Sequence, residues 1–184
     1  MLTAPTYATG RLNVSAYRGR HFETGSPRPR PFPTVERFTI EVSMAYVICK
    51  EFRWEMGHRL APHPGDCRHI HGHSYRAAIQ VTGDLNEMGM VIDFGALGQI
   101  ARPLVDQLDH ALLLWKEDEP WVSFFQSQGQ KLVLMDTHPT TEHLAAWWAH
   151  QLKEALQDHS NLHQLTVTIH ESQTAWAAYS LPLR

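Results

Sequence analysis

Residues 67–75 read Cys-Arg-His-Ile-His-Gly-His-Ser-Tyr, which places one thiol and three imidazoles directly before a run of alternating apolar residues. Residues two apart in a strand point to the same face, so His71 and His73 can face one metal ion. Another imidazole, His58, ends a second alternating run upstream. Three neutral imidazoles with one open coordination position are typical of a catalytic zinc site. The sequence therefore predicts Zn²⁺ bound by His58, His71 and His73.

Two neighbouring residues compete for these ligand positions. Histidine is abundant, with 13 in 184 residues, so a His-x-His pair also arises by chance. His69 has the same two-residue spacing to His71, and spacing alone does not exclude it. Cys67 lies in a polar turn beside Asp66 and Arg68, which suits a reactive thiolate. A thiol is also a zinc ligand, so a fourth metal ligand remains the alternative reading of Cys67.

Composition is that of a globular domain, with 43% hydrophobic and 19% charged residues. No apolar run reaches the length of a membrane-spanning helix. Residues 44–184 carry ten Lys or Arg against sixteen Asp or Glu, and such an acidic body does not suit a general nucleic-acid binder. The two cysteines favour a reducing compartment, so we expect a cytoplasmic protein. Cys49 lies inside an apolar strand pattern and is expected in the core.

The first 43 residues have a different character. Residues 25–33 contain four prolines, and residues 1–43 hold six Arg and three Glu. Such a stretch does not form a helix or an interior strand. Met44 directly precedes the alternating pattern and is an alternative start of translation. We therefore expect residues 1–43 to be a disordered extension or a mis-assigned start, and residues 44–184 to be the folded domain.

The periodicity of apolar residues from Met44 onward predicts four strands and two helices. Their order is strand, strand, helix, helix, strand, strand, which indicates an α+β domain with a four-stranded antiparallel sheet. Residues 131–135 read as a short extra strand or a lid near the site. The expected strands cover 46–54, 75–81, 165–169 and 175–181, and the expected helices cover 94–108 and 140–156.

Two further groups of candidate residues fall at element ends. Asp109 and His110 close the first helix, where a carboxylate beside an imidazole can support acid–base chemistry. The alternative is a charge pair at a helix C-terminus. Glu171 ends the third strand, where a carboxylate can accept two N–H donors from an amino-pyrimidinone edge. Taken alone, Glu171 also reads as a solvated strand-end residue.

Together, these motifs resemble the 6-pyruvoyl-tetrahydropterin synthase superfamily, and the resemblance runs from about Tyr46 to Tyr179. The three residues between Cys67 and His71 are similar to the spacing in its bacterial 6-carboxy-tetrahydropterin synthases of queuosine biosynthesis. The matching motifs are His58-Arg59-Leu60, Cys67, His71-Gly72-His73, Tyr75, Gly89 to Phe94, Asp109-His110, Pro139-Thr140-Thr141-Glu142 and Glu171.

This resemblance implies the tunnelling fold, or T-fold, with its helices on one face of the sheet. It also implies a homotrimer that closes its sheets into a barrel, doubled to a hexamer, with sites between subunits. The implied reaction converts 7,8-dihydroneopterin triphosphate to 6-carboxy-5,6,7,8-tetrahydropterin, acetaldehyde and triphosphate. The alternatives are triphosphate elimination to 6-pyruvoyl-tetrahydropterin and a non-catalytic zinc- or pterin-binding module.

The resemblance also implies a role for each candidate residue. Zinc would polarise the side-chain hydroxyls of the substrate, and Cys67 would move protons at the side-chain carbons. Asp109 and His110 would form the partnering relay. Glu171 would anchor the pterin ring, with Thr140, Thr141 and Glu142 at its edge. No nucleic-acid or membrane partner is expected. The segment between His110 and Pro139 is longer than in compact bacterial members of the family.

Overall fold

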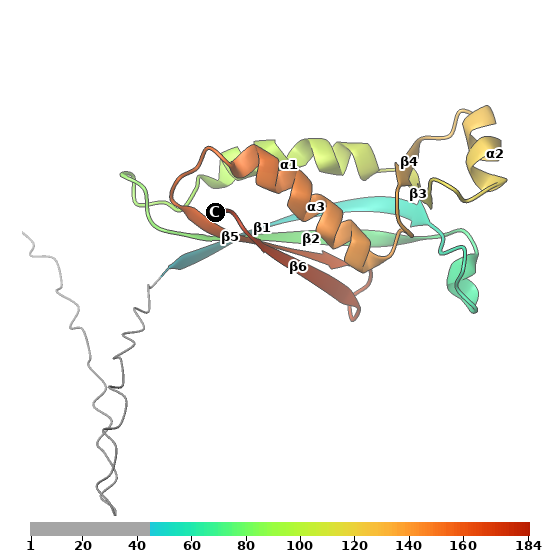
Figure 1. Ribbon diagram of the computed structural model, residues 1–184, viewed down its shortest axis with the longest axis horizontal. Coiled ribbons are helices and arrows are strands. Elements are labelled where there is room, and N and C mark those ends of the chain that lie inside the picture. The colour runs from blue at the N-terminus through green and yellow to red at the C-terminus, as the bar shows by residue number, and fades with distance from the viewer. Residues whose placement is uncertain (1–44) are drawn as a thin grey trace, which may run out of the picture. The chain divides into compact units, whose positions relative to one another are not determined.

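The computed structural model describes residues 45–184, so the expectation for residues 1–43 lies outside the described residues. Two long strands form the centre of the sheet, β1 (Tyr46–His58) and β2 (His71–Gly83). They pair antiparallel over their whole length, with Tyr46 opposite Gly83 and His58 opposite His71 (Figure 1). Both strands run beyond the alternating segments that predicted them, and both extend to the histidines of the predicted metal site.

The sheet has six strands in the order β4-β3-β1-β2-β5-β6. β5 (Leu162–His170) and β6 (Trp176–Pro182) continue the antiparallel pairing beyond β2. On the other side, β3 (Ala111–Trp115) pairs parallel with β1, and β4 (Leu132–Met135) pairs parallel with β3. The prediction of a four-stranded antiparallel sheet is therefore wrong in strand number and direction. The short extra strand expected at residues 131–135 is confirmed as β4.

Two long helices, α1 (Phe94–Leu108) and α3 (Thr141–Leu156), cover the same face of the sheet (Figure 1). The carboxylate of Asp93 caps α1 by accepting the N–H of Ala96. The hydroxyl of Thr140 caps α3 in the same way. Short polar side chains at this position satisfy N–H groups that the helix itself leaves unpaired. The two predicted helices and their common face are thus confirmed.

A third helix, α2 (Trp121–Ser127), lies between β3 and β4 and was not predicted. The observed order within the described residues is β1-β2-α1-β3-α2-β4-α3-β5-β6, in place of the expected strand, strand, helix, helix, strand, strand. A 3₁₀ turn, Asp66–Arg68, joins β1 to β2. None of the helices of this part of the chain is long and apolar enough to cross a membrane.

The core lies between the sheet and the two long helices. Alternate side chains of β1 point into this core, and those between them point to the other face of the sheet. Trp148 of α3 is fully buried and stacks on Trp54 of β1, with 5.3 Å between ring centroids. Trp54 shares its side of β1 with His58, which is 1% exposed, so the alternation carries this imidazole into the protein. Cys49 falls on the other parity and is exposed. The expectation that Cys49 fills the core is therefore wrong.

Candidate functional site

A cluster of three imidazoles and one carboxylate forms where β1 ends and β2 begins. His58 and His71 are directly opposite in the β1–β2 pairing, so their side chains emerge on the same face. His73 is two residues further along β2, and Glu171 directly follows β5. One ligand atom of each residue lies within 4.8 Å of those of the other three. The structure thus brings together the three predicted histidines and adds Glu171.

Backbone carbonyls fix the orientation of two of these rings. Nδ1–H of His58 donates to the carbonyl oxygen of Pro139 at 3.0 Å, and Nδ1–H of His71 donates to that of His69 at 2.8 Å. A proton held on Nδ1 directs the lone pair of Nε2 inward. The two Nε2 atoms lie 3.1 Å apart. Two lone pairs at that distance repel unless a cation lies between them, so this arrangement requires a proton or a metal ion.

The remaining two members of the cluster complete a donor set for a cation. Oε1 of Glu171 lies 3.2 Å from Nε2 of His58 and 3.3 Å from Nε2 of His73. The second contact is short enough for an ion pair but lacks hydrogen-bond geometry, so the buried Nε2 of His73 has no hydrogen-bond partner within residues 45–184. An imidazole nitrogen in this state is free to coordinate a metal ion. Three imidazoles and a carboxylate therefore fit a divalent metal ion.

The electrostatics of the cluster favour neutral imidazole and ionised carboxylate. Burial lowers the pKa of His73, although the nearby carboxylate of Glu171 opposes that shift. The close contact with His58, at 3.2 Å, lowers the pKa of Glu171 against the effect of burial, and the side chain of Thr141 adds to the lowering. Metal ligands must be deprotonated, and both shifts hold these groups in the ligating form.

Cys67 and His69 both stand outside this four-residue cluster. Cys67 lies in the 3₁₀ turn and is half-buried, and its carbonyl oxygen accepts the N–H of Leu60 at 2.9 Å. That hydrogen bond closes the loop between the two central strands. His69 contributes its backbone carbonyl to the orientation of His71, while its own ring faces Nε of Arg68 at 3.4 Å.

Asp109 and His110 form a pair at the end of α1, as the sequence suggested. Oδ1 of Asp109 lies 3.0 Å from Nδ1 of His110 and accepts the backbone N–H of Glu55 at 3.1 Å. This backbone hydrogen bond is the main reason that the pKa of Asp109 is lowered. His110 has a φ of 57° and donates its own N–H to the carbonyl oxygen of Glu55 at 2.7 Å. The hydrogen bonds to β1 thus hold a left-handed residue whose ring is 78% exposed.

Lys131, just before β4, braces this pair from the other side. Its Nζ donates to the carbonyl oxygens of Asp106 at 2.7 Å and Asp109 at 2.6 Å. Carbonyl groups in the last turn of a helix have no partner within the helix, and a cation there is favoured. No local sequence pattern predicts this contact, because Lys131 is 22 residues from Asp109.

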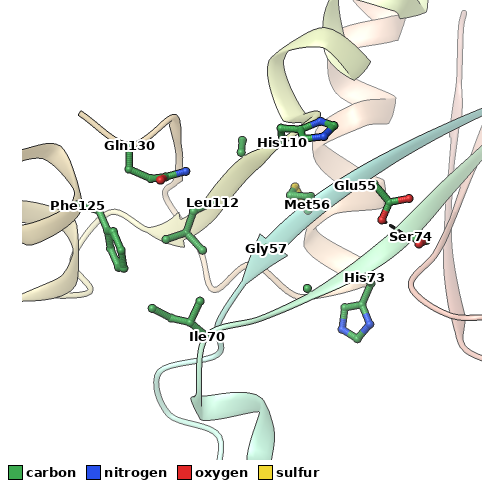
Figure 2. Close-up of a pocket in the computed structure, with 12 residues that line it drawn as sticks. Glu55, Met56, Gly57, Ile70, His73, Ser74, His110, Leu112, Phe125 and Gln130 are labelled. Carbon is green, nitrogen blue, oxygen red and sulfur yellow. Dashed lines mark hydrogen bonds between the residues drawn. The ribbon is translucent and has the colours of Figure 1, made fainter. Parts of the chain in front are cut away.

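A cavity of about 510 Å³ opens beside the Asp109–His110 pair (Figure 2). Glu55 and Ser74 line it and are joined by a hydrogen bond of 2.8 Å from the Ser74 hydroxyl. Phe125 adds a wall from α2. Figure 2 shows the rings of His110 and His73 pointing away from one another. Within a single chain, the Asp109–His110 pair therefore does not face the cluster of three histidines and Glu171.

Comparison with known proteins assigns this arrangement to a family. A family model described as 6-pyruvoyl tetrahydropterin synthase matches residues 47–182, which include every residue of the cluster and of the Asp109–His110 pair. The chain belongs to the 6-pyruvoyl tetrahydropterin synthase family. The resemblance drawn from the sequence motifs is thereby confirmed.

Proteins similar to this chain align with most of its length. The 6-carboxy-5,6,7,8-tetrahydropterin synthase of Synechocystis sp. is 36% identical over 143 residues, 74% of this chain and 95% of that protein. The protein of the same name from Haemophilus influenzae is 30% identical over 142 residues, 73% of this chain and 98% of its own. The structure of 6-pyruvoyl tetrahydropterin synthase from Plasmodium falciparum aligns with a TM-score of 0.63 at 19% identity, covering 76% of this chain and 99% of that one. At that identity the similarity shows the fold alone.

The three residues predicted to lie at the edge of the pterin ring are found at the start of α3, and each has a different environment. Thr140 uses its hydroxyl to accept the N–H of His143 at 3.3 Å, so it caps the helix. Thr141 is half-buried, and its side chain lies close enough to Glu171 to lower the pKa of that carboxyl group. Glu142 is exposed in the first turn. Of these three residues, Thr141 therefore has the direct contact with the cluster.

Proposed function

We propose that this chain converts 7,8-dihydroneopterin triphosphate to 6-carboxy-5,6,7,8-tetrahydropterin, acetaldehyde and triphosphate. The observation that carries the proposal is the pair of Nε2 atoms of His58 and His71, held 3.1 Å apart with both Nδ1 atoms hydrogen-bonded to carbonyl groups. Such a site is built for a cation. The relatives at 30% and 36% identity carry the name of this activity, and the motif spacing points to the same branch of the family.

Zinc is the ion that this donor set fits best, and His58, His71 and His73 would hold it. When bound, it would act as a Lewis acid on the hydroxyl groups of the substrate side chain. Glu171 balances the charge of the cluster and is ionised, because its contact with His58 lowers its pKa. The same carboxylate can accept the two N–H groups of an amino-pyrimidinone edge, which makes Glu171 the anchor of the pterin ring. Thr141 orients that carboxylate.

Cys67 is the proposed acid–base group at the substrate side chain. The loop that carries it is closed by the hydrogen bond between Leu60 and Cys67 and leads directly into the strand of His71 and His73. As a thiolate it would take a proton from one side-chain carbon and return it to another. Such transfer is most efficient when the pKa of the group is close to the working pH.

The Asp109–His110 pair is proposed to serve the site of a neighbouring subunit. Within one chain its ring points away from His73 (Figure 2), and it is 78% exposed. The sheet also ends in two edge strands, β4 and β6, and closure of several sheets into a barrel removes such edges. These features support a T-fold homotrimer or hexamer whose sites combine Cys67 from one chain with Asp109 and His110 from another.

The cellular context follows from this activity. We place the enzyme in queuosine (7-deazaguanine) biosynthesis and in the cytoplasm, where a protein with two free cysteines remains reduced. The folded unit is proposed to be residues 44–184, and residues 1–43 are proposed to be an extension outside it.

The test is to incubate the zinc-loaded full chain with 7,8-dihydroneopterin triphosphate and to identify the products by mass spectrometry. Carboxy-tetrahydropterin together with acetaldehyde is the expected result. Pyruvoyl-tetrahydropterin would instead show the triphosphate-eliminating activity of the family. If a folded, zinc-loaded oligomer gave no turnover, the protein would be a zinc- or pterin-binding module and the proposal would be wrong.

A further inference from the structure

A second cavity, of about 390 Å³, adjoins the first one and is basic. Its lining consists of Arg59, Arg68, His69, Ile70 and Trp121, without any carboxylate. We refer to it as the basic cavity. Ile70 lines both cavities, and Figure 2 shows its side chain beside the strand ends where the first cavity opens. The two cavities therefore share the side chain of Ile70 as a common wall.

Two residues of the basic cavity are near neighbours in the chain of the candidate metal ligands. Arg59 directly follows His58 in the chain. The carbonyl oxygen of His69 accepts Nδ1–H of His71 at 2.8 Å. An anionic group bound here would thus be attached to the same end of β1 and β2 that carries the metal ligands.

One wall of the basic cavity is rigid. Nη1 of Arg59 lies 3.4 Å from Oδ1 of Asp118, which is 5% exposed. The ring of Trp121 lies over the same guanidinium, with 5.6 Å between Cζ and the ring centroid, which is the range of a cation–π contact. Nε of Arg59 is buried without a hydrogen-bond partner among the described residues. The guanidinium of Arg59 is therefore held in place by Asp118 and Trp121.

Arg68 supplies the positive charge of the basic cavity that is not already paired with a carboxylate of the described residues. Arg68 is exposed, and its Nε faces Nε2 of His69 at 3.4 Å. Within the described part of the chain, no carboxylate makes an ion pair with Arg68. Arginine is the side chain best suited to phosphate, because its planar fork donates two parallel hydrogen bonds.

We propose that the basic cavity binds the polyphosphate chain of the substrate while the rest of the molecule occupies the histidine and Glu171 cluster. The identity of that chain as a triphosphate rests on the proposed function. Trp121 and Asp118 come from the long segment between His110 and Pro139, so this segment would act as a phosphate-binding element of this chain.

Inorganic triphosphate is the probe, titrated by calorimetry into the full-length protein. Replacement of one charge-assisted arginine contact should weaken its binding about tenfold in Arg68→Gln. The matched control is Arg102→Gln, which removes the same charge from an exposed position on α1 that contacts Phe52. It should bind inorganic triphosphate like the parent chain. Binding of unphosphorylated 7,8-dihydroneopterin should be the same in all three proteins, because only the phosphate contact is changed.

The inference is wrong if inorganic triphosphate does not bind, or if Arg68→Gln and Arg102→Gln weaken it equally. The binding measurement does not depend on turnover. If the parent chain binds inorganic triphosphate through Arg68 but yields no pterin product, the basic cavity is supported and the proposed reaction alone is contradicted. If product forms while Arg68→Gln binds inorganic triphosphate normally, the reaction stands and the basic cavity fails.

Discussion

Nζ of Lys131 lies 2.6 Å from the carbonyl oxygen of Asp109 and so ties the start of β4 to the end of α1. The same ammonium group reaches the carbonyl oxygen of Asp106 at 2.7 Å. The proposed acid–base pair is thereby held from two sides, by Lys131 and by the backbone of Glu55.

We expect Lys131→Met to lower the free energy of unfolding by about 1 kcal/mol, because it leaves helix-terminal carbonyl groups without their charged donor. Turnover should fall as well, and Lys131→Arg should restore part of it. Lys116→Met is the control, since Lys116 pairs with the exposed Asp136. Urea unfolding and steady-state kinetics measure both effects. Equal losses of stability in the two Met variants would contradict this role for Lys131.

The zinc content of histidine variants should distinguish the proposed ligands His71 and His73 from the neighbouring His69. His71→Ala and His73→Ala should lose bound zinc, because each removes one of the three imidazoles of the site. His69→Ala should retain it, because His69 contributes its backbone carbonyl rather than its ring. Elemental analysis after exhaustive dialysis is the measurement. Loss of zinc from His69→Ala would instead indicate that the ring of His69 is a metal ligand.

Cys67→Ala tests whether the thiol is an acid–base group or a ligand. As an acid–base group, Cys67 would contribute about 10²–10⁴-fold to turnover, and its removal would leave zinc content unchanged. Cys49→Ala is the matched control, because Cys49 is exposed on the outer face of β1. Loss of zinc or of folding in Cys67→Ala would support a structural four-ligand site instead.

The stability of the metal-free protein should depend on pH through Glu171. Its pKa is lowered from the ordinary value of 4.5, chiefly by the close contact with His58. A lowered carboxyl pKa contributes stability that is full above the unfolded value and is lost as pH falls through the folded value. The advantage of the parent chain over Glu171→Gln should therefore be largest at neutral pH and shrink below pH 4.5.

Urea midpoints of the two metal-free proteins across this pH range give the comparison. Glu142→Gln is the control, since Glu142 is exposed in the first turn of α3. A constant difference between the parent chain and Glu171→Gln at all pH values would show that the lost contact is not electrostatic.

The sequence predicted those parts of the fold and site that are encoded locally. Alternating residues revealed β1 and β2, and the His-x-His spacing placed His71 and His73 on one face. β3 was missed because Ala111 to Leu114 are all buried, and a strand covered on both faces shows no alternation. α2 has only seven residues, too few for a helical period to be recognised.

Contacts between distant segments account for the rest. The position of Glu171 against His58 and the brace of Lys131 on Asp109 depend on how β5 and β4 join the sheet, which no local pattern contains. Cys49 is an error of a different kind. It sits at an odd position of β1, whereas Trp54 and His58 of the core face sit at even ones, so parity alone would have placed it outside.

The hydrogen bond between His58 and Pro139 spans 81 positions of the chain, and Glu171 lies further still toward the C-terminus. A ligand set gathered from such separate segments does not exist in an unfolded polypeptide. The complete ligand set therefore forms only once β5 has been made, because a shorter chain has the carbonyl of Pro139 that orients His58 but lacks the carboxylate of Glu171. Loading of the proposed metal site is accordingly expected to be a late step, which follows the folding of the C-terminal strands onto β1 and β2.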